Sequence, residues 1–125
     1  MAEAFYSREH QWVRLEGAEA RVGITDFAQS SLGDIVFVEL PKPGAKLEKG
    51  EQAAVVESVK TASEVYSPIA GTVSAVNETL EGTPELVNSD PEGVAWFFTL
   101  AVEGKPDYSG LMTKAAYQDY VKTLE

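Results

Sequence analysis

Short runs of apolar and β-branched residues alternate with polar positions along most of the chain, a pattern typical of strands. In the run that begins at Gln11, alternation places Trp12 and Arg14 on the face opposite Val13. Gly, Pro and polar residues separate the runs, so each run is expected to end in a turn. Strands are predicted over residues 5–6 together with 11–15, and over 20–24, 34–40, 53–59, 65–66, 72–76 and 95–102.

A short helix is predicted from Thr25 to Gly33 because both of its ends are marked in the sequence. Thr25 or Asp26 can cap the first turn, and Gly33 suits the left-handed position after the last turn. Phe27 and Leu32 are the side chains that this helix is expected to bury in the core.

A second helix is predicted over residues 113–124, with Thr113 as its cap. Its apolar stripe follows three-four spacing, which predicts one buried face. The stripe consists of Ala116, Tyr117, Tyr120, Val121 and Leu124. Residues 83–88 predict a single helical turn with Pro84 at its first position, and residues 103–106 predict a turn after the last strand.

The segment from Val55 to Gly71 predicts a hairpin with Lys60 at its tip. Its turn is weakly marked, because residues 59–62 contain no Gly, Asn or Pro. Pro68 ends the second strand, since proline has no N–H to give to a ladder. A lysine at a hairpin tip is ordinarily a solvated charge, so residue chemistry alone gives Lys60 no special role.

The charge of the chain narrows its possible partners. Twenty acidic residues against ten basic ones give a net charge of −10. Such a surface repels phosphate backbones, so we expect no nucleic-acid partner. It suits docking to basic clefts on other proteins, although solubility is the simpler interpretation. The acidic and basic residues of the opening stretch MAEAFYSREH interrupt any apolar run, so no signal peptide and no membrane contact are expected.

The residues offer little chemistry of their own. The chain has no cysteine, which fits a reducing cytoplasm and leaves no thiol nucleophile. Its single histidine, His10, is expected to be structural, because no serine lies in a nucleophile-elbow motif. The acidic residues have no metal-loop spacing, so no metal site is expected. The aromatic residues Trp12, Phe37, Trp96, Phe97 and Phe98 are interpreted as core.

The stretch ESVKTASEVYSPIAG resembles the lipoyl-attachment segment of the glycine cleavage system H-protein family. Further blocks follow in the order of that family: REHQWV, VGITDFAQSSLGDIVFVELP, KGEQAAVVESVK and VNETLEGTPELVNSDP, then a Trp-centred strand and a C-terminal helix. The resemblance extends from about Tyr6 to about Tyr120. It implies one lipoyl-carrier domain over residues 1–125, a mainly β barrel-sandwich hybrid with short helices and a C-terminal helix.

The resemblance also implies a function. In the family, the lysine at the position of Lys60 carries lipoate through an amide bond, attached by a lipoylating enzyme. A pyridoxal-phosphate glycine decarboxylase (P protein) loads the arm with an aminomethyl group, and a tetrahydrofolate-dependent aminomethyltransferase (T protein) unloads it. Dihydrolipoyl dehydrogenase (L protein) then reoxidises the arm. The chain is therefore expected to be a cytoplasmic carrier protein, not an enzyme, and a monomer when free.

Two positions depart from the family pattern. Gln11 replaces the acid of the usual HEWV motif, and the resemblance implies that this acid helps to hold the amine-loaded arm. A glutamine accepts hydrogen bonds but gives up the charge, so docking of the amine is expected to be weaker. The stretch PEGVAWFF differs from the family's usual Gly-acid-Gly-Trp arrangement, which leaves the shape of this loop open.

Glu57 and Glu64 flank the lysine. They are equally well interpreted as marks that the lipoylating enzyme reads and as ordinary polar strand residues. Glu64 has a further possible role in receiving the amine, since Gln11 carries no charge.

Other classes fit the sequence less well. Biotinyl domains present Met-Lys-Met, and acyltransferase lipoyl domains present Asp-Lys-Ala, whereas this chain has Val59-Lys60-Thr61. An H-like relay or interaction module without glycine cleavage activity remains an alternative because of Gln11. A hydrolase has no supporting residues.

Overall fold

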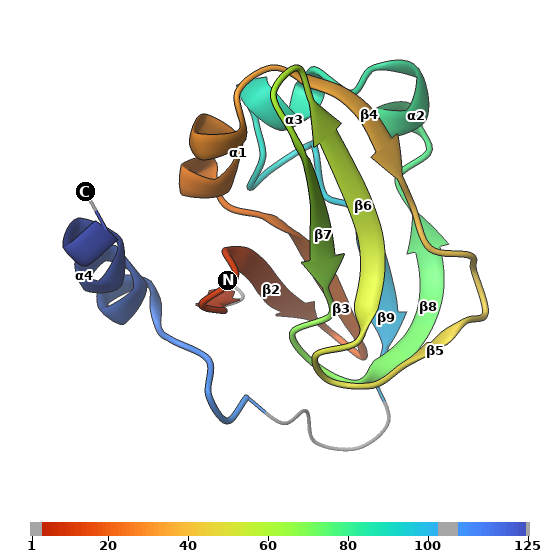
Figure 1. The fold of residues 1–125 in the computed structure, drawn as a ribbon. Helices are drawn as coiled ribbons and strands as arrows, with labels where there is room; N and C mark the ends of the chain where they lie inside the picture. Colours follow the sequence, from red (N-terminus) through yellow and green to blue (C-terminus); the bar gives the residue numbers. More distant parts are fainter. Residues whose placement is uncertain (1–3, 103–107, 125) are drawn as a thin grey trace.

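A computed structural model of the chain describes residues 4–102 and 108–124. Two antiparallel sheets carry the fold, with three helices at one end and a fourth at the side (Figure 1). The strands are β1 (Ala4–Tyr6), β2 (Gln11–Glu16), β3 (Glu19–Ile24), β4 (Ile35–Glu39), β5 (Lys46–Leu47), β6 (Gln52–Ser58), β7 (Ala62–Tyr66), β8 (Gly71–Val76) and β9 (Phe98–Ala101). The helices are α1 (Asp26–Leu32), α2 (Thr79–Gly82), α3 (Leu86–Ser89) and α4 (Lys114–Leu124).

One hydrophobic core lies between the sheets. The larger sheet has the order β1-β2-β3-β9-β8-β5, and the smaller sheet has the order β4-β6-β7. Val22 and Phe98 from the larger sheet join Val38 and Val56 from the smaller one in a single cluster, each at most 1% exposed. The expected fold class, a mainly β barrel-sandwich hybrid with short helices and a C-terminal helix, is confirmed.

The N-terminal segment forms two strands where one was expected. β1 and β2 pair antiparallel, because residues 7–10 turn the chain back on itself. His10 donates its backbone N–H to the Ser7 carbonyl and adopts a φ of 70°, which the apolar-polar pattern cannot indicate. The prediction of opposite faces is confirmed, since Trp12 packs with Tyr6 and Tyr117 while Val13 joins the main core.

Trp12 also determines the choice of residue on the next strand. It pairs with Gly23, and a Cβ on that glycine would lie 2.8 Å from the indole ring. The indole N–H donates to the Pro91 carbonyl at 3.0 Å, which ties the loop before β9 to β2.

The strand predicted over residues 95–102 is shorter than expected. Asn77 explains this difference, because its side-chain amide donates to the carbonyls of Val94 and Trp96, both at 2.8 Å. Those residues therefore follow an irregular path before β9 begins. β5 and α2 were not predicted, and α3 begins at Leu86 instead of residue 83. The turn expected at 103–106 lies outside the described residues.

Two predictions about burial are wrong, those for Phe37 and Phe27. Phe37 is 47% exposed, because β4 contains a bulge and its outer face is uncovered. The prediction for Trp96 is confirmed in part: its side chain is half-buried against the cluster of Trp12 and Tyr117, and its ring centroid lies 5.1 Å from Cζ of Arg21. Phe27 does not belong to the core but lies against His10, with a ring-centroid distance of 4.7 Å. Trp12, Phe97 and Phe98 are buried as predicted.

Both longer helices have the caps that the sequence predicts. Thr25 accepts from the Ala28 N–H at 3.2 Å, and Gly33 ends α1 with a φ of 86°. Thr113 accepts from the Ala116 N–H at 3.3 Å at the start of α4. The predicted apolar stripe of α4 is narrower than expected, because only Tyr117 among its members is buried.

Candidate functional site

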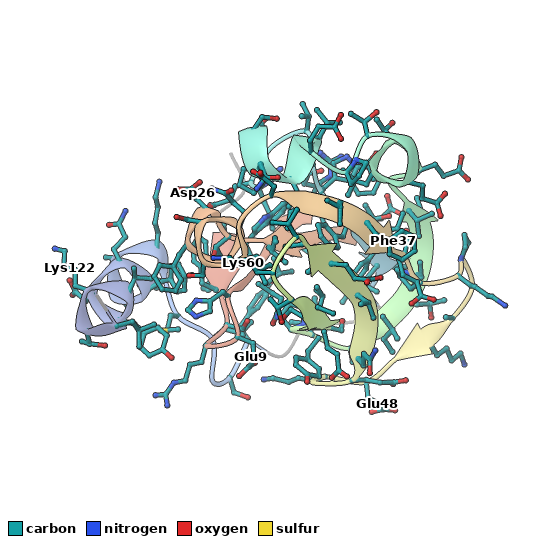
Figure 2. All side chains as sticks on the ribbon, turned by 45° about the horizontal axis from the view of Figure 1, so that its top comes forward. Glu9, Asp26, Phe37, Glu48, Lys60 and Lys122 are labelled. Atoms are coloured by element: carbon teal, nitrogen blue, oxygen red, sulfur yellow. The ribbon has the colours of Figure 1, made fainter. Side chains whose placement is uncertain are left out.

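The β6–β7 hairpin carries Lys60 at its tip, as the sequence predicts. The two strands pair up to Glu57 opposite Ala62, so the turn begins directly after Ser58. Val59, Lys60 and Thr61 are all exposed. Figure 2 shows Lys60 at the end of the smaller sheet.

Ser58 shapes this turn. Its hydroxyl oxygen accepts from the backbone N–H groups of Lys60 and Thr61, each at 3.2 Å. The Ser58 N–H donates to the Thr61 carbonyl at 2.8 Å. The Ser58 side chain thereby satisfies two backbone N–H groups of the turn and stabilises a turn that contains no Gly, Asn or Pro. Ser58 is therefore the residue in the sequence that could have indicated a turn at this position.

The segment between α1 and β4 contacts the tip of the β6–β7 hairpin and supports it. The Val59 N–H donates to the Asp34 carbonyl at 3.0 Å. A Cβ on Gly33 would lie 3.1 Å from Cε of Lys60, so the lysine side chain passes directly over the glycine. These two contacts hold the tip at both its backbone and its side chain.

Asn88 on α3 fixes that supporting segment. Its Oδ1 accepts from the Ile35 N–H, and its Nδ2 donates to the Gly33 carbonyl and to Oε1 of Gln29, all at 2.9 Å. One side chain therefore joins the end of α1 to the start of β4. Sequence reasoning did not find Gly33, Asp34 or Asn88 as site residues, since no local pattern reveals contacts across 25 or more positions.

The Lys60 ammonium is exposed to solvent and has no bound partner among the described residues. Within residues 4–102 and 108–124, no side chain or carbonyl forms a hydrogen bond or ion pair with it. Together with its exposure, this leaves the amine accessible to an enzyme that acylates it. The local geometry therefore fits covalent attachment of a carboxylic acid cofactor through an amide bond.

The two acids that flank the lysine have different surroundings. Glu57 is exposed on β6 and faces Ala62 across the ladder. Glu64 is exposed on β7, where its carboxylate accepts from the Tyr66 hydroxyl at 2.7 Å. This hydrogen bond, and then the Glu64 charge, raise the pKa of Tyr66 above its usual value. The charge of Glu9, which lines the same cavity as Tyr66, adds a smaller contribution to the raised pKa of Tyr66.

Gln11 has a structural role. It is 2% exposed; its Oε1 accepts from the Ser7 hydroxyl at 2.7 Å, and its Nε2 donates to the Glu9 carbonyl at 3.1 Å. It lines a cavity of about 170 Å³ together with Glu9 and Tyr66. Both ends of the Gln11 amide are thus hydrogen-bonded to residues of the turn between β1 and β2.

His10 is hydrogen-bonded, as expected for a structural residue. Its Nδ1 lies 2.8 Å from the Tyr117 hydroxyl, which lies 2.7 Å from the Thr25 hydroxyl. Burial lowers the pKa of His10 and raises that of Tyr117 to about 12. These two hydrogen bonds join His10, Tyr117 and Thr25 in a chain that ties α4 to the cap of α1.

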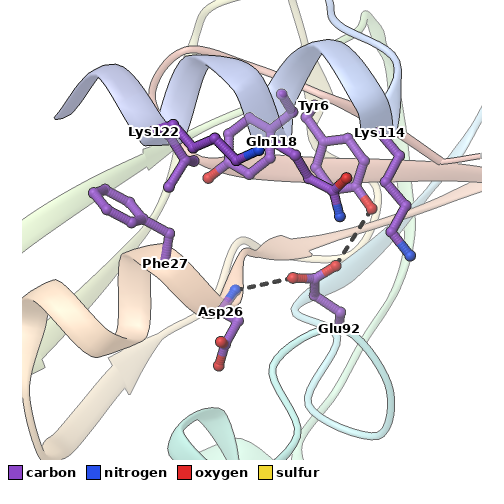
Figure 3. A pocket seen from close by; sticks show the side chains of 9 residues that line it. Tyr6, Asp26, Phe27, Glu92, Lys114, Gln118 and Lys122 are labelled. Atoms are coloured by element: carbon purple, nitrogen blue, oxygen red, sulfur yellow. Dashed lines mark hydrogen bonds between the residues drawn. The ribbon is translucent and has the colours of Figure 1, made fainter. Parts of the chain in front are cut away.

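A larger cavity of about 420 Å³ opens between α4 and α1 (Figure 3). The Glu92 carboxylate lies at its edge, where it accepts from the Asp26 N–H at 2.9 Å and from the Tyr6 hydroxyl at 3.4 Å. These bonds fix the loop PEGVAWFF, whose shape the sequence left open, against α1 and β1.

Two kinds of feature are absent from the described residues. No cluster of three or more His, Cys, Asp or Glu side chains in these residues is arranged to hold a metal ion. None of the described helices is long and apolar enough to cross a membrane.

Comparison with known proteins gives a consistent result. A family model described as "Glycine cleavage H-protein" matches residues 4–124. The glycine cleavage system H protein of Chromobacterium violaceum is 62% identical over 117 residues, which cover 93% of this chain and 91% of that protein. The H protein of Paramagnetospirillum magneticum is 50% identical over 125 residues, which cover 100% of both chains.

A solved structure agrees with these matches. The crystal structure of a glycine cleavage system H protein from Mycobacterium marinum superposes with a TM-score of 0.84 at 32% identity, and the match covers 96% of this chain and 97% of that one. The chain therefore belongs to the glycine cleavage H-protein family.

Proposed function

We propose that this chain is the lipoyl carrier of a glycine cleavage system, a single domain over residues 1–125 that bears lipoate on Lys60. It carries the aminomethyl group of glycine from glycine decarboxylase to aminomethyltransferase, and dihydrolipoyl dehydrogenase reoxidises the arm. Membership of the H-protein family supports a carrier on which partner enzymes act. The cytoplasm is the proposed compartment.

The observation that carries this proposal is the setting of Lys60. Its ammonium is exposed and has no hydrogen-bond partner in the described part of the chain, so a lipoylating enzyme can reach it. When bound there as an amide, lipoate supplies a dithiolane that opens to accept a one-carbon amine and closes on oxidation. The protein contributes position: Ser58, Asp34 and Gly33 hold the root of the arm in one place.

A fixed root matters because several enzymes must admit the same arm. Each hydrogen bond at the tip removes backbone freedom before an encounter, so less conformational entropy is lost when an enzyme binds. The H-like relay without glycine cleavage activity was kept open because of Gln11. The hydrogen bonds of Gln11 to Ser7 and Glu9 give that glutamine a local structural explanation.

Glu64 is the proposed acceptor of the loaded amine. Its carboxylate is exposed four positions after Lys60 and accepts from the hydroxyl of Tyr66, which lines one cavity with Glu9. Glu64→Gln is expected to slow aminomethyl transfer more than it slows lipoylation, because the amine is cationic and the unloaded arm is neutral. Equal effects on both steps would remove Glu64 from this role.

The test of the proposal is an intact mass of protein isolated from its native cells, followed by peptide mapping. We expect one lipoyl group on Lys60 and none on the other lysines. Lys60→Arg should abolish both the modification and glycine decarboxylation with the partner enzymes, whereas Lys122→Arg on α4 should leave both unchanged. An unmodified Lys60 in cells that lipoylate other proteins would favour the H-like module.

A further inference from the structure

The outer face of the smaller sheet combines an exposed aromatic ring with a set of carboxylates. Strand register places Phe37 opposite Glu57, and it places Glu39 opposite Val55, whose other neighbour is Glu64. Phe37 is 47% exposed, and the three glutamates are exposed around it. We call these five residues the acidic face; Figure 2 shows Phe37 on it and Lys60 at the hairpin tip of the same sheet.

The charge of this face has one sign. The strands β4, β6 and β7, whose residues the structure describes in full, contain three glutamates and no lysine or arginine. Lys60 is the base next to them, and acylation removes its charge. In the lipoylated protein, the face beside the arm therefore presents negative charge with nothing on its own strands to neutralise it.

The exposure of Phe37 follows from the bulge in β4. The register shifts between Ile35 and Phe37, so two successive side chains, Val36 at 54% and Phe37 at 47%, are exposed. Val59, at 67%, lies in the turn that is hydrogen-bonded to the start of the same strand. Among the described residues, five large apolar side chains are exposed, and three of them belong to β4 or to the lysine turn. This concentration indicates a contact surface at this end of the sheet.

We propose that the acidic face docks glycine decarboxylase, on a basic surface of that enzyme with an apolar socket for Phe37. Exposed aromatic anchors within a charged rim are typical of residues that dominate binding, while complementary charge speeds the encounter. This inference rests on the proposed function. The decarboxylase is the partner of choice because, of the three enzymes, it alone takes up a neutral arm and releases a cationic one, so the negative charge of the face is undiminished when the enzyme docks. After loading, the cationic amine reduces that charge and favours release.

The test compares variants of the lipoylated protein as substrates of glycine decarboxylase. Phe37→Ser should raise KM about tenfold or more with little change in kcat, since the ring contributes to binding and not to chemistry. Glu39→Gln should raise KM by about threefold and reduce its dependence on salt. Leu124→Ser is the matched apolar control, because Leu124 is also 47% exposed but lies on α4. Glu19→Gln on β3 is the matched acidic control.

Three results would overturn the docking face. These are a KM for Phe37→Ser equal to that of Leu124→Ser, a Glu39→Gln variant with unchanged salt dependence, or a loss confined to aminomethyltransferase, which would assign the face to that enzyme. A wild-type protein that fails to turn over would count against the proposed function alone. Docking would then be decided by calorimetry of the same lipoylated protein with glycine decarboxylase, where binding that Phe37→Ser weakens supports the face and absence of binding rejects it.

Discussion

The side chain of Lys60 lies across the backbone of Gly33, so closely that a Cβ on the glycine would lie 3.1 Å from Cε of the lysine and 3.7 Å from Nζ. The glycine ends α1 with a φ of 86°. The lysine proposed to carry the arm and the glycine that ends α1 therefore share the same small volume.

Gly33→Ala is expected to affect both stability and lipoylation. The positive φ alone should lower the free energy of unfolding by about 1–3 kcal/mol. In addition, the new methyl group should displace the lysine and slow lipoylation in a purified assay. Gly44→Ala is the control, since Gly44 has a φ of 91° and a Cβ on it would have no neighbouring atom within 4 Å. Equal lipoylation rates in the two variants would show that the contact with Lys60 is unimportant.

Asn88→Ala is expected to loosen the support of the tip. The change removes hydrogen bonds to Ile35, Gly33 and Gln29, so the free energy of unfolding in urea should fall by about 1–3 kcal/mol. The rate of amide hydrogen exchange should increase more at Ile35 and Val59 than at the residues of β8 and β9. A uniform increase over the whole chain would indicate global destabilisation instead of a local one.

The His10 network predicts a pH dependence. Burial lowers the pKa of His10 in the folded protein below its usual 6.5, so the unfolded chain binds the proton more readily. The stabilisation is therefore complete above about pH 6.5 and is lost as the pH falls through and below that value. Urea unfolding at pH 7.5 and 5.5 should show a larger decrease for the wild type than for His10→Asn, which tolerates the φ of 70° and does not titrate.

Gln11→Glu restores the residue type of the family motif at a buried position. A carboxylate there keeps the Ser7 hydroxyl as a donor but faces the Glu9 carbonyl without a proton to give. The free energy of unfolding should fall by about 1–3 kcal/mol at pH 7. Because burial raises the pKa of the new carboxyl, the loss should shrink as the pH falls through that pKa and the proton returns. Equal loss at pH 7 and pH 4.5 would contradict this account.

Much of the fold could be predicted from the sequence where local chemistry decides the outcome. Alternation identified β2, β3 and β8, and the caps of Thr25, Gly33 and Thr113 identified the ends of α1 and the start of α4. The hairpin with Lys60 at its tip was also expected, and the structure confirms its place. These features depend on neighbours within a few positions.

The remainder depends on contacts between distant segments. Phe37 resembles a core residue in the sequence, but only the register of β4 shows that its face is uncovered. Asn77 shortens β9 from 17 and 19 positions away, and Ser58 forms a turn that lacks the usual residues. The support of Lys60 by Gly33, in turn fixed by Asn88, was invisible for the same reason.

The position of Asn88 in the sequence also affects when, during synthesis, the lysine hairpin becomes a substrate for acylation. Asn88 lies 22 residues after Tyr66, the last residue of β7, so the ribosome has made the lysine hairpin before the residue that fixes the segment beneath it. Synthesis at about 5–20 residues per second leaves an interval of seconds in which the hairpin has emerged without its support. An enzyme that recognises the braced tip would thus acylate completed chains in preference to nascent ones, and attachment of the arm would report that folding has finished.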